Sequence, residues 1–360
     1  MKIFKGMKRI IFLLLLTLTI TCFACSSIIF SQEKASSKQL TFGMTVRTAT
    51  PPYARAMILG AEEKAKEVGV KIIVVDSNDD VLKQLEQIDN FIAMGVDGFI
   101  FGGTIDTAAV IPGIKKLNEH NIPIMALDNC PEGGRVELWI SFDIVQSSKK
   151  AAEAFVKVLE DKHGKIPEGV VIEITGALGD AFTNECYEGF HAIIDKYSQL
   201  TIVQGEGKWN NIDSFERTSD LLMRYGDEVV GIYIHTPDIM GPGVVSAVEQ
   251  AGYDPKKFAM AGICMGPEGV DLIKKGKISA IVGQPALASG ELAVQYLYDL
   301  CHGKDIPKIG DTVVKEGALW SPAIILENPR CEGAFMRLQG PLVPLEASPD
   351  DPRLWENKLK

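Results

Sequence analysis

The chain of 360 residues lacks the short motifs that carry most well-defined enzyme chemistry. It has no G-x-S-x-G serine nucleophile, no H-E-x-x-H zinc helix and no glycine-rich phosphate loop. Beyond the first 25 residues it also has no C-x-x-C pair. These absences argue against hydrolytic, zinc-dependent and nucleotide-dependent catalysis, and we expect neither a cofactor nor a metal site.

An excess of positive charge is also missing. The formal net charge is -10, and loss of the four basic residues Lys2, Lys5, Lys8 and Arg9 would lower it to about -14. Nucleic acids and anionic membrane surfaces are therefore poor partners. Hydrophobic content of 46% and charged content of 23% are typical of an ordinary globular protein.

The longest apolar run is too short to favour a membrane-spanning helix. It covers residues 10–20 after the basic start, whereas spanning takes roughly 20 apolar residues. This pattern predicts a secretory signal peptide over residues 1–24. A polar stretch over residues 25–39 then predicts a flexible tether.

Cys25 follows Ala24 and precedes Ser26, which resembles the lipobox of bacterial lipoproteins. The resemblance implies lipidation of Cys25, so that the exported protein would be periplasmic or at the cell surface, anchored by its N-terminal lipid. One departure is Cys22, where lipoproteins prefer leucine. Simple cleavage with release, or an uncut anchor, are the alternatives.

The remaining cysteines are few and widely spaced. Their odd number and spacing do not form a disulfide framework, and each is interpreted as a small buried hydrophobic side chain. A single Cys301–Cys331 bridge is an alternative in an exported protein. The five are Cys130, Cys186, Cys264, Cys301 and Cys331.

Short β-rich apolar runs alternate with helical stretches from Leu40 onward, and this alternation predicts parallel α/β structure. About 320 residues exceed one ordinary core, so we expect two Rossmann-like lobes, each with a parallel sheet of about five strands, joined by a multi-strand hinge. The predicted strands are Leu40–Val46, Lys71–Asp76, Gly98–Gly102, Ile122–Asp128, Leu138–Phe142, Val170–Thr175, Thr201–Gln204, Gly231–His235, Phe258–Ile263 and Ser279–Val282.

Helical spacing of apolar residues predicts helices such as Tyr53–Glu67 and Val81–Met94. The chain is expected to cross between lobes near Ser141–Gln146, at Gly283–Pro285 and after Pro307. This assigns residues 40–142 and 285–312 to the first lobe. Residues 143–284 and 313–360 form the second lobe and its tail.

Ligands of open parallel sheets bind where the strands end, so polar residues there are the candidates. In the first half these are Arg47 and Tyr53 after the first strand and Asp128 with Asn129 after the fourth. A carboxylate accepts charge-assisted hydrogen bonds from hydroxyls, and an aromatic ring packs on a sugar face. The structural alternatives are that Tyr53 caps its helix and that Arg47 pairs with an acid.

The second half offers a similar set of strand-end residues. Helix capping is the alternative for Asp180 and Asp238, and core packing is the alternative for Trp209. The candidates are Asn184, Trp209, Pro237, Asp238, Cys264 and Gln284.

An ordered series of short motifs resembles the type I periplasmic binding proteins, in particular their sugar-binding branch, over roughly residues 40–314. The motifs are Tyr53…Gly60-Ala61, Val74-Val75-Asp76-Ser77, Met94-Gly95-Val96-Asp97-Gly98, Ile122-Pro123-Ile124…Asp128, Glu188-Gly189-Phe190 and Gly283-Gln284-Pro285. The resemblance implies that Tyr53 and Trp209 stack on a sugar, that Asp128 grips hydroxyls, and that Gln284 reaches the ligand from the hinge.

Some positions depart from that branch. Asn129 and Asn184 stand where ribose binders often have arginine, Pro237 where they have asparagine, and Cys264 where they have aspartate. The Thr236-Pro237-Asp238 turn, Arg47 and the C-terminal tail are instead similar to the rhamnose and autoinducer-2 receptors of the same superfamily. A deoxysugar, polyol or small furanose-like ligand is therefore expected alongside a pentose.

The resemblance implies a monomer that closes around its ligand and delivers it to the permease of an ABC importer in the inner membrane. One alternative is a sensory receptor subunit that reports to a membrane kinase or chemoreceptor. A glycoside-acting enzyme would need two facing acids such as Asp128 and Asp238. Repressors of this fold carry a basic headpiece where this chain has a signal pattern.

Overall fold

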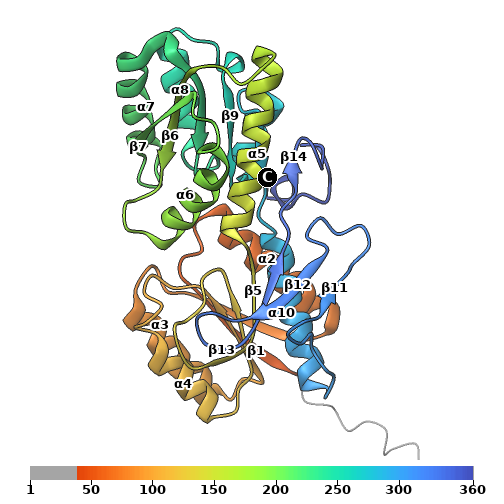
Figure 1. Ribbon diagram of the computed structural model, residues 1–360. Coiled ribbons are helices and arrows are strands. Elements are labelled where there is room, and N and C mark those ends of the chain that lie inside the picture. Colours follow the sequence, from red (N-terminus) through yellow and green to blue (C-terminus); the bar gives the residue numbers. More distant parts are fainter. Residues whose placement is uncertain (1–38, 360) are drawn as a thin grey trace, which may run out of the picture. The chain divides into compact units, whose positions relative to one another are not determined.

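The computed structural model describes residues 39–359. The predicted signal peptide, Cys25 and the tether up to Lys38 lie outside the described residues. The fold is contained in the compact unit Thr41–Lys360, which holds two sheets in two separate lobes (Figure 1). Within residues 39–359 no helix has both the length and the apolar character needed to cross a bilayer.

The first sheet has eight strands in the order β11-β12-β13-β5-β4-β3-β1-β2. β1 to β5 and β13 are parallel, and β12 is antiparallel to both of its neighbours. The strands are β1 (Thr41–Val46), β2 (Lys71–Asp76), β3 (Gly98–Gly102), β4 (Ile124–Leu127), β5 (Arg135–Phe142), β11 (Thr312–Val313), β12 (Ala323–Glu327) and β13 (Glu332–Leu338).

The second sheet has six strands in the order β14-β10-β9-β8-β6-β7. All pairings are parallel except that of β14 with β10. The strands are β6 (Gly169–Thr175), β7 (Leu200–Glu206), β8 (Val229–Ile234), β9 (Ala259–Ile263), β10 (Ala280–Val282) and β14 (Leu342–Val343).

Each sheet is covered by helices on both faces, which explains why its central strands are apolar throughout. In the first lobe α2 (Pro52–Val68) and α10 (Ala286–Cys301) pack together on one face, and α3 (Val81–Met94) and α4 (Ile111–Glu119) on the other. In the second lobe one face carries α5 (Ile144–His163) and α6 (Ala181–Ile194), while the other carries α7 (Asn211–Tyr225), α8 (Gly241–Gln250) and α9 (Gly266–Lys274).

The two α/β lobes and all ten predicted strands are confirmed, with small shifts at their ends. The placement of residues 313–338 in the second lobe is wrong. β12 and β13 extend the first sheet beside β5, and the chain crosses to the second lobe only before β14. β5 would otherwise be an edge strand, and its pairing with β13 satisfies backbone hydrogen-bonding groups that would be left unpaired.

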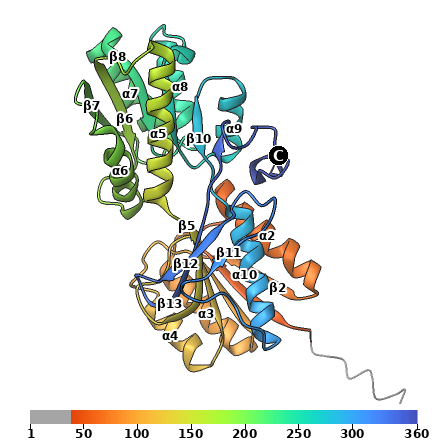
Figure 2. The same ribbon diagram turned by 45° about the vertical axis from the view of Figure 1, so that its right-hand side comes forward.

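Three segments pass between the lobes, as Figure 2 shows: between β5 and α5, between β10 and α10, and between β13 and β14. They are bonded to one another. The Gly283 amide donates to the Pro341 carbonyl at 2.9 Å, Arg337 Nη1 pairs with Asp143 at 3.1 Å, and Lys150 Nζ donates to the Gly340 carbonyl at 2.9 Å. The hinge is thus a bonded group of three crossings.

Candidate functional site

Arg47 and Tyr53 lie around the end of β1, at the edge where ligands of parallel sheets bind. Arg47 is exposed, and its Nε contacts the Asp79 carboxylate at 2.5 Å, so the structural alternative for this residue, pairing with an acid, is observed. Tyr53 is the second residue of α2, which starts with Pro52 at a position where no amide is needed. The N-cap residue of α2 is Pro51, which makes no side-chain capping hydrogen bond.

Asp128 follows β4 in a left-handed conformation, with φ of 56°. Its backbone carbonyl accepts a hydrogen bond from Trp139 Nε1 at 2.8 Å, which fixes the turn. Burial raises the pKa of its carboxyl to about 6, against the opposing effects of the Arg47 charge and of the Asn129 amide. An acid held in this way sits near its protonation midpoint at mildly acidic pH.

The Asn129 side chain is hydrogen-bonded to the loop that follows β3. Its Oδ1 accepts from the Thr104 amide at 2.9 Å, and its Nδ2 donates to the Thr104 carbonyl at 2.8 Å. Both groups of the side-chain amide are therefore occupied by the loop that follows β3. The pair ties together the two loops that flank Asp128.

In the second lobe, Asp238 and Cys264 lie at the ends of neighbouring strands β8 and β9. The Asp238 amide donates to the Cys264 carbonyl at 3.2 Å. Burial raises the pKa of the Asp238 carboxyl to about 7, although backbone amides, including that of Ile239, oppose the shift. The buried Pro237 lies where it would contact any side chain at Gly262.

Ionisable groups of the two lobes act on one another across the hinge. Burial raises the pKa of Tyr53 well above its ordinary value, and the nearby Asp128 and Cys264 raise it further. Burial likewise raises the pKa of Cys264, with added effects from Asp238 and Asp128. We call Tyr53, Asp128, Asp238 and Cys264 the cross-lobe cluster. Its members are four titratable groups, one of them on an aromatic ring, and each follows the end of a different strand.

Trp209 lies beside α6, and Asn184 lies within it, both in the second lobe. Trp209 packs edge-on against Phe182 at 5.6 Å, and its indole occupies the space above Gly176. Asp180 caps α6 by accepting from the Phe182 amide at 2.8 Å and also accepts from Trp209 Nε1 at 3.2 Å. The capping alternative for Asp180 is therefore observed. Asn184 is exposed in the first turn of α6.

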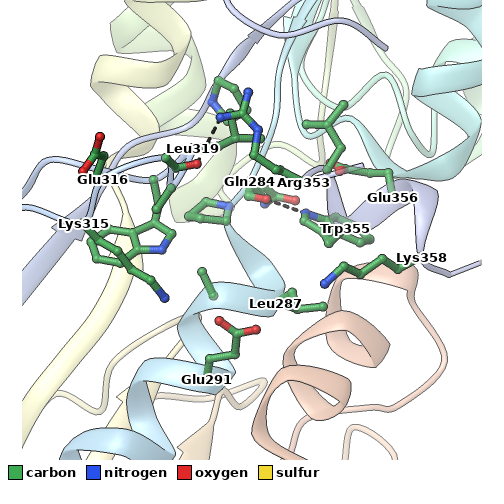
Figure 3. A pocket seen from close by; sticks show the side chains of 17 residues that line it. Gln284, Leu287, Glu291, Lys315, Glu316, Leu319, Arg353, Trp355, Glu356 and Lys358 are labelled. Carbon is green, nitrogen blue, oxygen red and sulfur yellow. Dashed lines mark hydrogen bonds between the residues drawn. The ribbon is translucent and has the colours of Figure 1, made fainter. Parts of the chain in front are cut away.

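A cavity of about 340 Å³ lies at the hinge, and of the ten predicted ligand residues Gln284 lines it (Figure 3). The start of α10, the loop between β11 and β12, and the C-terminal tail supply the rest of its wall. Trp355 Nε1 donates to the Gln284 carbonyl at 2.5 Å. The wall includes Leu287, Glu291, Lys315, Trp320, Arg353, Trp355, Glu356 and Lys358.

Glu356 is the residue that sequence reasoning missed. It lies in the one-turn helix η3 (Trp355–Asn357) and is only 2% exposed. Neither carboxylate oxygen has a hydrogen-bond partner on another described residue. Burial raises its pKa to about 8 against the effect of its own backbone amide, and the charge of Asp238 in the cross-lobe cluster raises it further. Its position in the tail, far from any strand end, gave no signal in the sequence.

The possible Cys301–Cys331 bridge is wrong. All five described cysteines are free, and Cys301 Sγ donates to the Asp97 carbonyl at 3.5 Å at the end of α10. Cys331 lies instead in the turn between β12 and β13. The alternative, burial as small hydrophobic groups, describes Cys130, Cys186 and Cys264.

Comparison with known proteins agrees with this fold. The model of the periplasmic binding protein domain family matches residues 42–305. The ribose import binding protein RbsB of Bacillus subtilis is 30% identical over 281 residues, covering 77% of this chain and 86% of the relative. The D-apiose import binding protein of Actinobacillus succinogenes is 24% identical over 274 residues, covering 73% and 84%.

Solved structures give the same result for the fold. A solute-binding protein from Actinobacillus succinogenes with bound D-allose superposes with a TM-score of 0.66 at 22% identity, covering 75% of this chain and 94% of that one. A sugar-transport substrate-binding protein from Bordetella parapertussis gives 0.67 at 19% identity, covering 89% and 93%. Two α/β lobes, three crossings and the family match together define a binding protein of type I. The chain belongs to the periplasmic binding protein domain family.

Proposed function

We propose that the protein binds a small polar, sugar-like ligand outside the cytoplasm and delivers it to the permease of an ABC importer. The observation that carries the proposal is the cross-lobe cluster. In it, Tyr53 and Asp128 of one lobe lie within electrostatic range of Cys264 of the other lobe, and Cys264 lies beside Asp238. A ligand held there would contact both lobes at once.

The chemistry of the cluster suits a polyhydroxylated molecule. The Tyr53 ring offers an apolar face for the C–H side of a sugar, while carboxyl groups bind hydroxyls through strong hydrogen bonds. Glu356, with a pKa of about 8, holds its proton near neutral pH and offers both a donor and an acceptor. We therefore add Glu356 to the proposed ligand contacts, alongside Gln284.

The mechanism follows from a ligand that contacts two lobes joined by a hinge. Open and closed arrangements interconvert, and only the closed one makes the full set of contacts, so the ligand shifts the population towards it. Moving such an equilibrium from mostly open to mostly closed takes about 5.5 kcal/mol of differential binding. A few hydroxyl bonds and one stacked ring supply energy of that order.

The proposal also includes export of the protein and its attachment to a membrane. The basic and apolar start of the chain supports a signal peptide, and Cys25 supports attachment through an N-terminal lipid. We propose a monomer that is tethered outside the cytoplasm and whose closed form docks on the permease. Mass spectrometry of the membrane fraction tests the anchor, because a lipidated protein begins at Cys25 and carries acyl chains.

A thermal-shift screen tests ligand binding. Ribose and D-apiose come first, because two relatives are named for importing them, followed by deoxyhexoses, polyols and small furanoses. We expect one compound class to raise the melting temperature of the wild type by several degrees and to lose this effect in Asp128→Ala. Asp89→Ala is the matched control, since Asp89 is an exposed acid on α3 paired with Lys116.

Two outcomes would count against the proposal. If no sugar or polyol stabilises the wild type, the ligand class is wrong. If Asp128→Ala and Asp89→Ala respond equally to the bound compound, Asp128 does not contact it.

A further inference from the structure

Two thiols meet where the loop after β4 passes the turn between β12 and β13. Cys130 follows Asp128 by two residues and is fully buried, and Cys331 is partly exposed. Their Sγ atoms are 3.6 Å apart, although 201 positions separate the residues along the chain. The Asn328 side-chain amide lies 3.3 Å from each sulfur. The two side chains are thus in direct contact at a hydrophobic cluster of the first lobe.

Other contacts hold the two backbones together at this point. The Glu332 amide donates to the Gly134 carbonyl at 3.3 Å, and Glu332 pairs with Arg135 where β13 joins β5. Arg330 Nη1 also lies 3.7 Å from the Glu132 carboxylate. The backbone pairing and the ion pair therefore hold the segments that carry the two sulfurs next to each other, independently of the sulfur contact. Bond formation requires the sulfurs to approach to about 2.0 Å.

The two thiols differ in a way that suits stepwise oxidation. The interaction with Cys130 lowers the pKa of the Cys331 thiol, while the interaction with Cys331 and burial raise that of Cys130. Cys331 is also the more exposed of the two. The accessible thiol therefore has more thiolate character, and the thiolate is the species that attacks a disulfide.

We propose that Cys130 and Cys331 form a disulfide bond in the exported protein, and that this bond fastens the Asp128 loop to the turn between β12 and β13. The inference rests on the export step of the proposed function, because thiols stay reduced in the cytoplasm. It does not depend on the identity of the ligand.

The reaction needs an oxidant, which we take to be a dithiol oxidase or a small disulfide such as oxidised glutathione. The Cys331 thiolate attacks one sulfur of the small disulfide and releases one glutathione as thiolate. Cys130 then loses its proton to water and attacks the Cys331 sulfur, which releases the second glutathione. The two protein thiols lose two electrons and two protons, and the small disulfide gains the two electrons.

The bond would act on both the site and stability. The same turn carries Arg330, whose Nη2 lies 3.6 Å from Glu185 on α6 of the second lobe. Fixing Cys331 to Cys130 therefore couples the loop of a proposed ligand residue to a contact between the lobes. Because the bond closes a loop of 201 positions, it also constrains the unfolded chain strongly.

The test uses the purified mature chain, incubated with oxidised glutathione, alkylated with iodoacetamide and digested without reductant. We expect one crosslinked peptide joining Cys130 to Cys331 and, in an undigested sample taken before alkylation, an intact mass lower by about 2 Da, the loss of two hydrogens. Cys331→Ser should abolish both signals. Cys301→Ser is the matched control and should retain them, since Cys301 contacts the Asp97 carbonyl instead. Reduction should lower the melting temperature of the wild type by several degrees and leave that of Cys331→Ser unchanged.

Three results would overturn the inference. Alkylation of both thiols after oxidation would show that the bond does not form. A lasting glutathione adduct on Cys331 would show that Cys130 does not complete the exchange. A crosslink from Cys331 to another cysteine would show different pairing. A failed sugar screen would leave the disulfide result standing, because the two experiments measure different properties.

Discussion

The indole Nε1 of Trp355 donates a hydrogen bond to the backbone carbonyl of Gln284 at 2.5 Å. This bond joins the C-terminal tail to the hinge segment between β10 and α10. Both residues are buried, and both line the cavity of about 340 Å³ at the hinge. The tail is therefore part of the structure that carries the proposed hinge motion.

Trp355→Phe removes this hydrogen bond but keeps most of the apolar ring. We expect a loss of about 1–3 kcal/mol in the free energy of unfolding, because the buried Gln284 carbonyl is left without its partner. Trp355→Ala should cost more, about 3–5 kcal/mol, since the ring contacts are lost too. Urea denaturation measures both. Equal stability of Trp355→Phe and the wild type would show that the bond contributes nothing.

Glu356 should make the protein less stable as the pH rises, whereas an ordinary salt-bridged acid makes a protein more stable as the pH rises. Burial, together with Asp238, raises its pKa to about 8 in the folded protein, compared with about 4.3 in an unfolded chain. Between these values the folded state holds a proton that the unfolded state has released, so this group reduces stability as pH rises towards 8. Each pKa unit corresponds to about 1.4 kcal/mol.

Glu356→Gln should remove this pH dependence. The difference in stability between variant and wild type should shift in favour of the variant by several kcal/mol from pH 5 to pH 9, as measured by urea denaturation at each pH. Glu316→Gln is the matched control, because Glu316 is an exposed glutamate on the rim of the same cavity. Parallel pH profiles for wild type and Glu356→Gln would contradict the assignment.

The central strands of both lobes could be predicted because their signals are local. β1, β3 and β9 are short apolar runs between helical stretches, and apolar periodicity distinguishes the two. The tail could not be predicted in the same way. β13 pairs with β5 across almost 200 residues of sequence, and β12 pairs with β13; no periodicity within a strand specifies a partner so far away.

The candidate site was predicted at the strand ends for the same reason. Asp128 and Asp238 follow buried strands, and the topology of parallel sheets brings such ends to one edge. The contacts of individual side chains could not be predicted in this way. The Asn129 side chain bonds with Thr104, and the Glu356 carboxyl is supplied by the C-terminal tail. Both positions depend on packing between segments that are distant in the sequence. Cys130 and Cys331 meet for that same reason.

Glu173 gives the opposite pH behaviour from Glu356. It is fully buried in β6, and although burial raises its pKa, hydrogen bonds with His191, His235 and Gln204 outweigh this effect and lower the pKa to about 2. The stability it contributes is present above the unfolded pKa of about 4.3 and is lost as pH falls towards 2. Its nearest partner is Gln204 Nε2 at 2.7 Å, followed by His235 Nε2 at 2.9 Å.

Glu173→Gln should destabilise the protein by about 3 kcal/mol at pH 7, because it weakens a buried charged network around two histidines. Urea denaturation should show the difference from wild type shrinking between pH 5 and pH 3, where Glu173 takes up a proton in the unfolded chain but stays ionised in the folded protein. A difference that stays constant over this range would mean that the charge of Glu173 contributes no stability.

Close packing of α2 on α10 depends on two glycines. A Cβ at Gly60 would overlap the Leu287 carbonyl, and one at Gly290 would overlap the Met57 carbonyl. Gly60→Ala should therefore push the helices apart and cost about 1–3 kcal/mol by overpacking, despite the better helix propensity of alanine. Glu62→Ala, on the exposed side of the same helix, should stay within about 0.5 kcal/mol of wild type. Because α10 begins at the hinge, Gly60→Ala should also weaken the response to ligand in the thermal-shift assay, whereas a variant as stable as wild type would show that the helices separate without cost.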